Sequence, residues 1–248
     1  MTKSGKMLLL IGATSDIGRA TAMRFADAGW RVALAARNDA EARRNADDIA
    51  ARTGAEVTTR RIDILESDLF VPFVDALPAL PDTVVCVVGE LGDQARAQSD
   101  PDHARMILRT NFEGPALLLG LLAERFAARG SGTLVGVSSV AGDRGRGSNY
   151  LYGAAKAGFT AFLSGLRNRL APTGVRVVTV KPGFVRTRMT AGMKLPPLLT
   201  AEANEVGQAI FAAAETGRSD VIYVRRIWRF VMMAVGGIPE PIFKRLRL

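Results

Sequence analysis

The chain has 248 residues, of which 48% are hydrophobic, so it fits one α/β domain with a large core and excludes a disordered protein. The single cysteine, Cys86, gives no disulfide framework and no metal cluster, and the single histidine, His103, excludes chemistry built on several histidines. We expect no metal site. The net charge of +9 fits either nucleic acid or an anionic membrane surface. Because no aromatic and basic recognition surface is visible, we expect no nucleic-acid partner.

The first apolar run covers residues 7–11 and ends at Gly12. Five residues are too few for the core of a signal peptide or for a membrane span. We therefore expect a cytoplasmic location by default.

Short apolar runs alternate with helical patterns along the chain. The apolar runs lack polar alternation, which is typical of parallel strands covered on both faces. This alternation predicts a single-domain α/β protein with a Rossmann-type, doubly wound parallel sheet. We assign residues 1–224 to the dinucleotide-binding and catalytic domain and 225–248 to a C-terminal apolar and basic extension of the same domain. Strands are expected at 7–11, 31–35, 56–62, 84–88, 133–137, 175–180 and 221–224, and helices at 17–28, 39–52, 103–128 and 152–170.

The turn after the first strand resembles a nucleotide-binding turn. Its glycines allow the backbone to approach a pyrophosphate, and the following helix N-terminus supplies amide donors. Asp16 stands where a middle glycine is expected, and we expect it to cap the helix. The turn supplies the candidate cofactor residues Gly12, Thr14, Ser15, Asp16, Ile17 and Gly18.

The end of the second strand bears on the choice of cofactor. Arg37 stands there, and no acidic residue precedes Asp39. An acid at this point usually binds a ribose hydroxyl, whereas a 2′-phosphate prefers an arginine, so the sequence favours NADP(H) over NAD(H). A solvated loop arginine is the alternative. After the third strand, Asp63 and Ile64 are candidates for contact with the adenine, although Asp63 could instead cap a helix.

Tyr152 and Lys156 are four residues apart, and Ser139 lies thirteen residues before the tyrosine. On a helix, a pair at this spacing shares one face. A phenol ordinarily has a pKa near ~10, and a nearby cation lowers it. A serine hydroxyl beside the phenol could hold a carbonyl oxygen. The three residues therefore predict a site that moves a proton at oxygen while a hydride moves at carbon.

Together these features resemble the short-chain dehydrogenase/reductase family over nearly the whole chain. The resemblance implies that Ser139, Tyr152 and Lys156 are catalytic. Tyr152 would be the general acid, Ser139 would orient the carbonyl, and Lys156 would lower the phenol pKa and hold the nicotinamide ribose. Asn111 would organise a proton-relay water through a break in its helix. The resemblance also implies cofactor contacts at Gly89, Pro182, Gly183, Val185 and Thr187, the last with the carboxamide.

Two departures from the family pattern, at Asp16 and at residues 89–93, are similar to one subgroup, the decaprenylphosphoryl-2-keto-β-D-erythro-pentose reductases. This similarity implies reduction of the 2-keto group of a polyprenyl-phosphoryl pentose after a flavin oxidase has acted, in a homodimer or homotetramer. A soluble polyol, sugar or 3-oxoacyl substrate remains an alternative, as does a non-catalytic nucleotide-binding scaffold. Arginines that could pair with a substrate phosphate, or be merely solvated, are Arg144, Arg146, Arg186 and Arg188.

The C-terminal extension combines apolar and basic residues. Within 221–248 there are six arginines and lysines against one acid, Glu240. Apolar residues from Ile227 to Val235 recur at helical spacing. This pattern suits a segment at the inner face of a membrane, and it equally suits an oligomer interface or a lid over the substrate. Pro196 and Pro197 are expected in a loop that covers the substrate.

Overall fold

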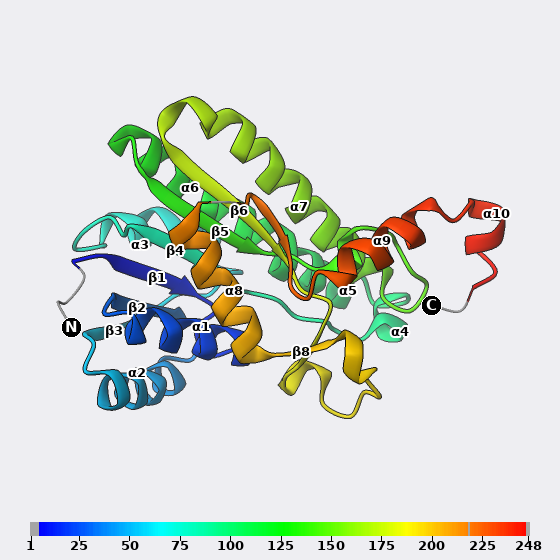
Figure 1. Cartoon of the computed structure of the whole chain (residues 1–248), viewed down its shortest axis with the longest axis horizontal. Helices are drawn as coiled ribbons and strands as arrows, with labels where there is room; N and C mark the ends of the chain where they lie inside the picture. The colour runs from blue at the N-terminus through cyan, green and yellow to red at the C-terminus, as the bar shows by residue number, and fades with distance from the viewer. Residues whose placement is uncertain (1–4, 218, 247–248) are drawn as a thin grey trace.

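The computed structural model describes residues 5–217 and 219–246 (Figure 1). Its centre is a seven-stranded parallel sheet in the order β3-β2-β1-β4-β5-β6-β9, which confirms the predicted doubly wound α/β fold. A separate two-stranded sheet pairs β7 with β8. The strands are β1 (Met7–Ile11), β2 (Arg31–Ala36), β3 (Val57–Arg61), β4 (Thr83–Cys86), β5 (Gly132–Val137), β6 (Val175–Lys181), β7 (Phe184–Arg186), β8 (Thr200–Glu202) and β9 (Val221–Tyr223).

Helices cover both faces of the sheet (Figure 1). One face packs against α1, α2 and α8, and the other against α3, α6 and α7. The α-helices are α1 (Asp16–Asp27), α2 (Asp39–Thr53), α3 (Phe70–Asp75), α4 (Gln94–Ala97), α5 (Pro101–Leu108), α6 (Gly114–Arg129), α7 (Tyr150–Leu170), α8 (Ala203–Thr216), α9 (Ile227–Gly237) and α10 (Glu240–Phe243).

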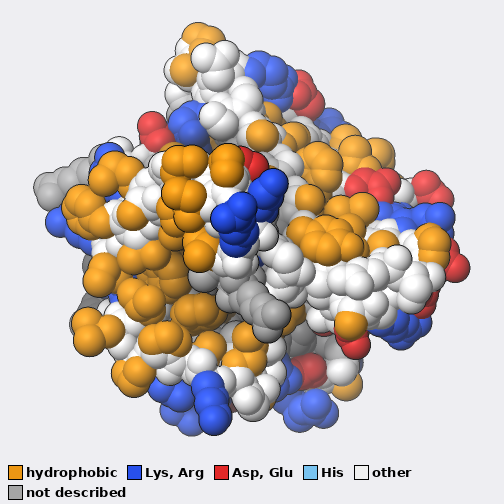
Figure 2. Space-filling view, turned by 90° about the vertical axis from the view of Figure 1, so that its right-hand side faces the viewer, with side chains coloured by type: hydrophobic (Ala, Val, Ile, Leu, Met, Phe, Trp, Pro, Cys, Tyr) orange, Lys and Arg blue, Asp and Glu red, His pale blue; other side chains and the backbone are white. Residues whose placement is uncertain are grey.

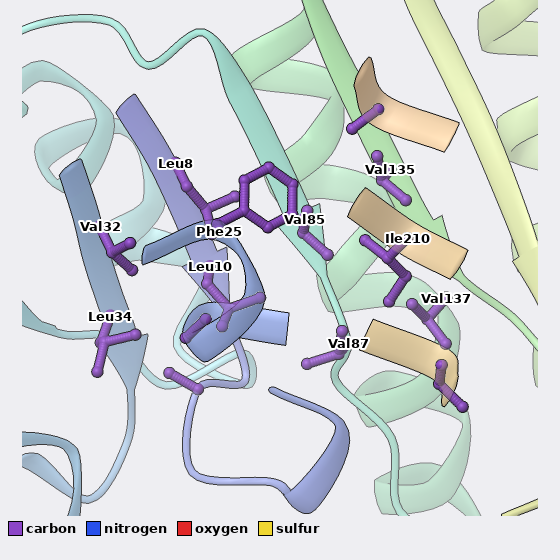
Figure 3. Packing of buried hydrophobic residues seen from close by; sticks show 14 of the residues in the cluster. Leu8, Leu10, Phe25, Val32, Leu34, Val85, Val87, Val135, Val137 and Ile210 are labelled. Atoms are coloured by element: carbon purple, nitrogen blue, oxygen red, sulfur yellow. The ribbon is translucent and has the colours of Figure 1, made fainter. Parts of the chain in front are cut away.

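The strand sequences explain this layering. Successive side chains of a strand point to opposite faces, so β1 sends Leu8 and Leu10 to one core and Leu9 to the other. Figure 3 shows Leu8 and Leu10 with Phe25 of α1 and Ile210 of α8. Because both faces of the central strands are buried, apolar residues occupy most of their positions. The parallel arrangement also places the carboxyl ends of all these strands at one edge, where open α/β sheets bind ligands.

The helix predicted at 103–128 is interrupted. A π-helical turn, η2 (Arg109–Glu113), separates α5 from α6, and Asn111 lies in its middle. The expected break at Asn111 is therefore confirmed. Gly114 follows at a close approach, because a Cβ there would lie 2.1 Å from the carbonyl oxygen of Ile64.

The N-cap of α1 is Ser15, so the expectation that Asp16 caps this helix is wrong. Ser15 Oγ accepts a hydrogen bond from the Gly18 amide at 3.0 Å. Asp16 begins the helix, where its charge suits the helix dipole. Its carboxylate accepts from the Arg188 amide at 2.7 Å and pairs with the Arg188 guanidinium at 3.3 Å. Asp16 therefore fixes a loop 172 residues away in sequence.

The C-terminal extension lies against the loops at the carboxyl edge of the sheet (Figure 1). Trp228 of α9 packs on Val140 and on Phe184, whose ring centre is 5.4 Å away, and its Nε1 donates to the carbonyl of Leu199 at 2.9 Å. No helix in the described ranges is long and apolar enough to cross a membrane. The division of the chain at residue 224 stays a prediction.

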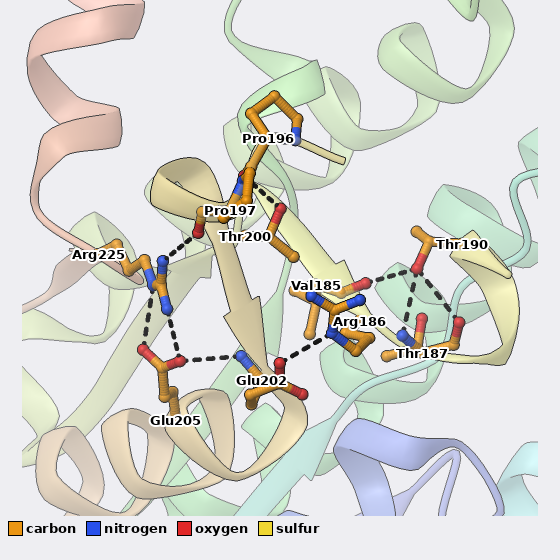
Figure 4. Close-up of polar contacts among 10 residues, drawn as sticks. All are labelled: Val185, Arg186, Thr187, Thr190, Pro196, Pro197, Thr200, Glu202, Glu205 and Arg225. Carbon is orange, nitrogen blue, oxygen red and sulfur yellow. Dashed lines mark hydrogen bonds and ion pairs between the residues drawn. The ribbon is translucent and has the colours of Figure 1, made fainter. Parts of the chain in front are cut away.

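Arg225 connects the start of the extension to the loop that contains the two prolines (Figure 4). Its guanidinium binds Glu205 of α8 at 2.9 Å and the carbonyl of Pro197 at 2.9 Å. In the same loop, Thr200 Oγ1 donates to the carbonyl of Pro196 at 2.7 Å. The loop is thus held by Arg225 of the extension and by its own Thr200.

Candidate active site

A pocket of about 720 Å³ opens at the carboxyl edge of the sheet. Ser139, Tyr152 and Lys156 all line it. Ser139 follows β5 directly, while Tyr152 and Lys156 lie one turn apart on α7. The structure therefore brings the three predicted residues into one cavity.

Most of the predicted cofactor residues lie on the same pocket. Asn111, Gly12, Thr14, Gly18, Arg37, Asp63 and Ile64 are not among the residues that line it. Gly12 and Gly18 instead shape the turn beside it, and Arg37 ends β2 at the same edge of the sheet. The predicted residues that do line the pocket are Ser15, Asp16, Ile17, Gly89, Ser139, Tyr152, Lys156, Pro182, Gly183, Val185 and Thr187.

The two serines after β5 have different contacts. Ser138 Oγ donates to the carbonyl of Lys156 at 2.9 Å and lies 2.7 Å from the Thr160 hydroxyl, so it joins β5 to α7. Ser139 is hydrogen-bonded to Tyr152 and accepts from the Ala141 amide at 3.1 Å. The hydroxyl that faces the phenol is therefore that of Ser139.

Lys156 is 2% exposed, and its ammonium donates to the carbonyls of Val88 at 3.1 Å and Val137 at 3.2 Å. Val88 lies just after β4, and Val137 is the last residue of β5. The lysine therefore connects α7 to the ends of two neighbouring strands. Burial lowers the pKa of Lys156 from its ordinary 10.5 to about 8. The ammonium Nζ lies 5.8 Å from the centre of the Tyr152 ring.

Tyr152 is partly buried, and the removal of its phenol from water raises the pKa above the ordinary value. The hydrogen bond from Ser139 and the charge of Arg146 offset part of this rise. The expectation that Lys156 lowers the phenol pKa below its ordinary value is wrong in its net direction. The cation whose charge acts on the phenol is Arg146, because Lys156 directs its donors to backbone carbonyls.

Asn111 is fully buried and uses its whole amide on the backbone. Its nitrogen donates to the carbonyls of Glu90 at 2.7 Å and Ile107 at 2.8 Å, and its Oδ1 accepts from the Glu90 amide at 3.1 Å. Asn111 thus holds the loop after β4 against the π-helical turn. Its part in a proton relay stays a prediction.

The nucleotide turn is shaped by close backbone contacts. Gly12 has a φ of +89°, and a Cβ there would lie 3.1 Å from the Val88 amide nitrogen. A Cβ on Gly18 would lie 2.5 Å from the Gly12 carbonyl oxygen. The turn therefore leads tightly into the N-terminus of α1, where a pyrophosphate can meet backbone amides. Because Asp16 is paired with Arg188, its charge is compensated beside this position.

The residues predicted to contact the adenosine half of a cofactor lie at the ends of β2 and β3. Arg37 is exposed at the end of β2, and Asp39 is paired with Arg43 at 2.6 Å. Within the described ranges no ion pair engages the Arg37 guanidinium, and the nearby acid Asp39 is already paired. Asp63 Oδ1 accepts from the Leu65 amide at 3.0 Å, which closes a turn rather than caps a helix. Contact of Asp63 or Ile64 with the adenine stays a prediction.

Of the four arginines considered for a substrate phosphate, three are bound to the chain itself. Arg144 donates to the carbonyls of Val235, Gly236 and Ile238 and pairs with Glu240. Arg186 pairs with Glu202, and Arg188 pairs with Asp16 and Glu41. The part of the chain that the structure describes offers no such partner to Arg146, which lines the pocket.

Three polar or aromatic residues are among those of the pocket wall that sequence reasoning missed. Gln94 of α4, Asn149 before α7 and Trp228 of α9 all line the cavity. Gln94 and Asn149 stand in polar segments without a recognisable motif. Trp228 was visible as part of an apolar helical pattern, but the pattern alone does not say what the helix packs against.

Comparisons with known proteins agree with this geometry. A family model described as short chain dehydrogenase matches residues 6–196. An uncharacterized oxidoreductase of Mycobacterium tuberculosis is 38% identical over 242 residues, covering 96% of each chain. The sulfoacetaldehyde reductase 2 of Chromohalobacter salexigens is 33% identical and covers 74% of each chain.

A solved structure of a short-chain dehydrogenase from Sphingobium yanoikuyae in complex with NADPH has the same fold, with a TM-score of 0.82, 23% identity and coverage of 98% and 96% of the two chains. A parallel sheet of this topology with a serine, a tyrosine and a lysine in one pocket defines a nicotinamide-dependent oxidoreductase. The chain belongs to the short-chain dehydrogenase family.

Proposed function

We propose that the protein reduces a ketone or aldehyde to an alcohol with NADPH. The observation that carries this proposal is the joint presence of Ser139, Tyr152 and Lys156 in a pocket bordered by the glycine-containing turn. When bound, the nicotinamide supplies a hydride to the carbonyl carbon. The remaining chemistry, which is the delivery of a proton to the carbonyl oxygen, falls to side chains of this chain.

The contacts assign a part to each side chain. Tyr152 donates its phenolic proton to the carbonyl oxygen, and its raised pKa keeps that proton on the phenol at neutral pH. Ser139, hydrogen-bonded to the phenol, donates to the same oxygen and orients the carbonyl. Lys156 holds the segment after β4 and the end of β5 in place, and the charge of Arg146 acts on the phenol as it gives up its proton. The phenolate regains its proton from solvent.

Tyr152→Phe tests the proposal, because this change removes the proton donor and little volume. We expect a fall in kcat of about a hundred-fold or more with NADPH and a reducible aldehyde, measured by loss of the nicotinamide absorbance. Binding of NADPH, followed by fluorescence, should be retained. Full turnover by the variant would exclude Tyr152 as the acid.

The proposed cofactor preference is NADP(H), on the strength of Arg37 and the paired state of Asp39. The proposed assembly is a homodimer or homotetramer, as the family resemblance implies. A flavin oxidase as a partner in the pathway stays a prediction of the same resemblance. Soluble sugars, polyols and 3-oxoacyl compounds are all compatible with the site.

A polyprenyl-phosphoryl 2-keto pentose is the second candidate substrate, and the exposed face of the extension favours it. Phe230 and Met233 of α9 are 62% and 69% exposed, and Arg226 and Arg229 are exposed on the same segment. Figure 2 shows hydrophobic side chains together with lysines and arginines on the side of the molecule that carries the extension. The same helix contributes Trp228 to the pocket. The headgroup of a lipid in the inner face of the membrane would therefore enter the pocket close to the surface that contacts the membrane.

A further inference from the structure

Three side chains in the wall of the pocket bear buried polar atoms that have no hydrogen-bond partner among the described residues. They are Nε of Arg146, Nε2 of Gln94 and Oδ1 of Asn149. Buried polar groups in folded proteins are nearly always hydrogen-bonded, so unpaired ones require a cause. All three residues share the cavity with Tyr152. Their grouping beside the reacting position points to a ligand that completes their hydrogen bonds.

The loop after Ser139 explains why Arg146 has no acidic partner. The Asp143 carboxylate forms an ion pair with Lys181 at 2.6 Å and accepts a hydrogen bond from the Tyr223 hydroxyl at 2.9 Å. Arg144 takes Glu240. The loop therefore brings Arg146 to the pocket, while the acid of the same loop, Asp143, is already paired with Lys181.

Acids elsewhere in the wall of the pocket do not neutralise this arginine. Asp16 is paired with Arg188, and Glu90 is exposed, with no ion pair formed by its carboxylate in the described ranges. The charge of Arg146 instead acts on the Tyr152 phenol. Arg146 is thus an uncompensated cation close to the reacting position.

Gln94 has a fixed side-chain orientation, and Asn149 has a fixed backbone. Gln94 Oε1 accepts from the Leu151 amide at 3.1 Å, in the first turn of α7, which leaves its Nε2 donor directed elsewhere. Asn149 immediately precedes α7, and its amide nitrogen on the backbone donates to the carbonyl of Arg146 at 3.2 Å. One donor and one acceptor therefore accompany the guanidinium.

We propose that Arg146, supported by Gln94 and Asn149, binds an anionic group of the substrate: a carboxylate, sulfonate or phosphate ester near the carbonyl that Tyr152 protonates. A guanidinium binds such oxygens through two parallel hydrogen bonds, which fixes orientation as well as charge. Gln94 Nε2 donates to the same anion, and Asn149 Oδ1 accepts from a substrate hydroxyl. This inference rests on the proposed reductase function and adds the substrate class.

The test uses one aromatic scaffold with different charges. 4-Formylbenzoate, 4-formylbenzenesulfonate and 4-formylphenyl phosphate are compared with the neutral methyl 4-formylbenzoate, with NADPH at pH 7. The wild type should favour at least one anion, and which one identifies the type of group. Arg146→Met should lower the ratio of kcat/KM for that anion to kcat/KM for the ester about ten-fold or more. Loss of the charge that acts on the Tyr152 phenol slows both substrates alike and cancels in this ratio.

Three comparisons separate recognition of an anion from other roles. Arg146→Lys keeps the positive charge but cannot form the two parallel hydrogen bonds of a guanidinium. Its kcat/KM for the anion should lie between those of the wild type and Arg146→Met. Arg169→Met removes the same charge at the far end of α7, about 25 Å from Tyr152, and should leave the selectivity unchanged. KM for NADPH should also be unchanged in Arg146→Met. A rise in that KM, or equal losses for anion and ester, would overturn the proposal.

A binding measurement keeps this inference distinct from the reductase function. Benzoate, benzenesulfonate and phenyl phosphate are titrated calorimetrically into the NADP⁺-bound wild type and into Arg146→Met. Binding by the wild type that weakens about ten-fold in the variant supports the anion site even if no aldehyde of the panel is reduced. Failure of all three anions to bind the wild type, or equal binding by the variant, would overturn it.

Discussion

At the scale of single residues, the buried ammonium of Lys156 links activity to stability. Below about pH 8 both the folded and the unfolded chain hold its proton, so the cost of burying a charge is fully present. Between about 8 and the ordinary 10.5 only the unfolded chain keeps that proton, so this group makes the free energy of unfolding rise with pH. The lowering of the Lys156 pKa from 10.5 to about 8 corresponds to a change of about 3 kcal/mol in the free energy of unfolding.

Lys156→Met should remove that rise and abolish reduction. Its free energy of unfolding, measured in urea at pH 7 and pH 10, should increase less with pH than that of the wild type, by an amount on the order of 3 kcal/mol. Lys194→Met, at an exposed lysine, is the matched control and should follow the wild type. Parallel pH profiles for wild type and Lys156→Met would show that the ammonium is not the buried charge.

Arg37 is the residue that should set the choice of cofactor. Arg37→Asp places a carboxylate at the end of β2, where it would repel a 2′-phosphate and accept from a ribose hydroxyl. We expect kcat/KM with NADPH to fall about ten-fold or more, and that with NADH to be kept or to rise. Steady-state kinetics with both nucleotides measures this. An unchanged NADPH preference would mean that another group recognises the phosphate.

At the scale of elements, Arg225 combines a left-handed backbone with a clamp. It is the one non-glycine residue of positive φ in the described chain, at 58°, between β9 and α9. Its side chain binds Glu205 and two carbonyls of the proline loop. The left-handed region costs an L-residue with a side chain about 1 kcal/mol more than glycine, so the clamp is formed in spite of local strain.

Two substitutions separate the strain from the clamp. Arg225→Ala and Arg225→Gly both lose the clamp, but only glycine relieves the backbone, so Arg225→Gly should be the more stable by about 1 kcal/mol in urea unfolding. At Arg229, inside α9, the order should reverse, with alanine the more stable. If alanine is also better at 225, the left-handed backbone is not maintained in solution.

The elements differ in how far the sequence predicts them. Buried strands such as β1 follow from apolar runs in the sequence. The break at Asn111 is implied by the family resemblance alone, since the residue pattern predicts one helix over 103–128. The cap at Ser15 escaped prediction because Asp16, a good cap in isolation, is engaged by Arg188 from a distant loop. The orientation of α9 depends on Arg144, Phe184 and Leu199, none of which is near it in sequence. Contacts between distant segments are what the pattern of residues does not reveal.

At the scale of the whole molecule, α9 has two faces with different surroundings. Trp228 and Met232 are buried against the loops of the pocket, whereas Phe230 and Met233 face outward. A face that packs on the active site while its opposite face is apolar and basic suits a protein that draws its substrate from a lipid surface. Because the buried face of α9 packs on the loops of the pocket, attachment of α9 to a membrane would hold the pocket close to that membrane.

The outward face gives the last prediction. If α9 contacts membrane, the double variant Phe230→Glu, Met233→Glu should bind anionic phosphatidylglycerol vesicles about a hundred-fold more weakly than wild type, since two large apolar side chains no longer enter the lipid. Co-sedimentation measures the binding. Val71→Glu, at a half-exposed apolar residue of α3, is the matched control and should bind as the wild type does. Wild type that fails to sediment, together with a double variant that changes oligomeric mass in light scattering, would assign this face to contact between copies of the chain instead.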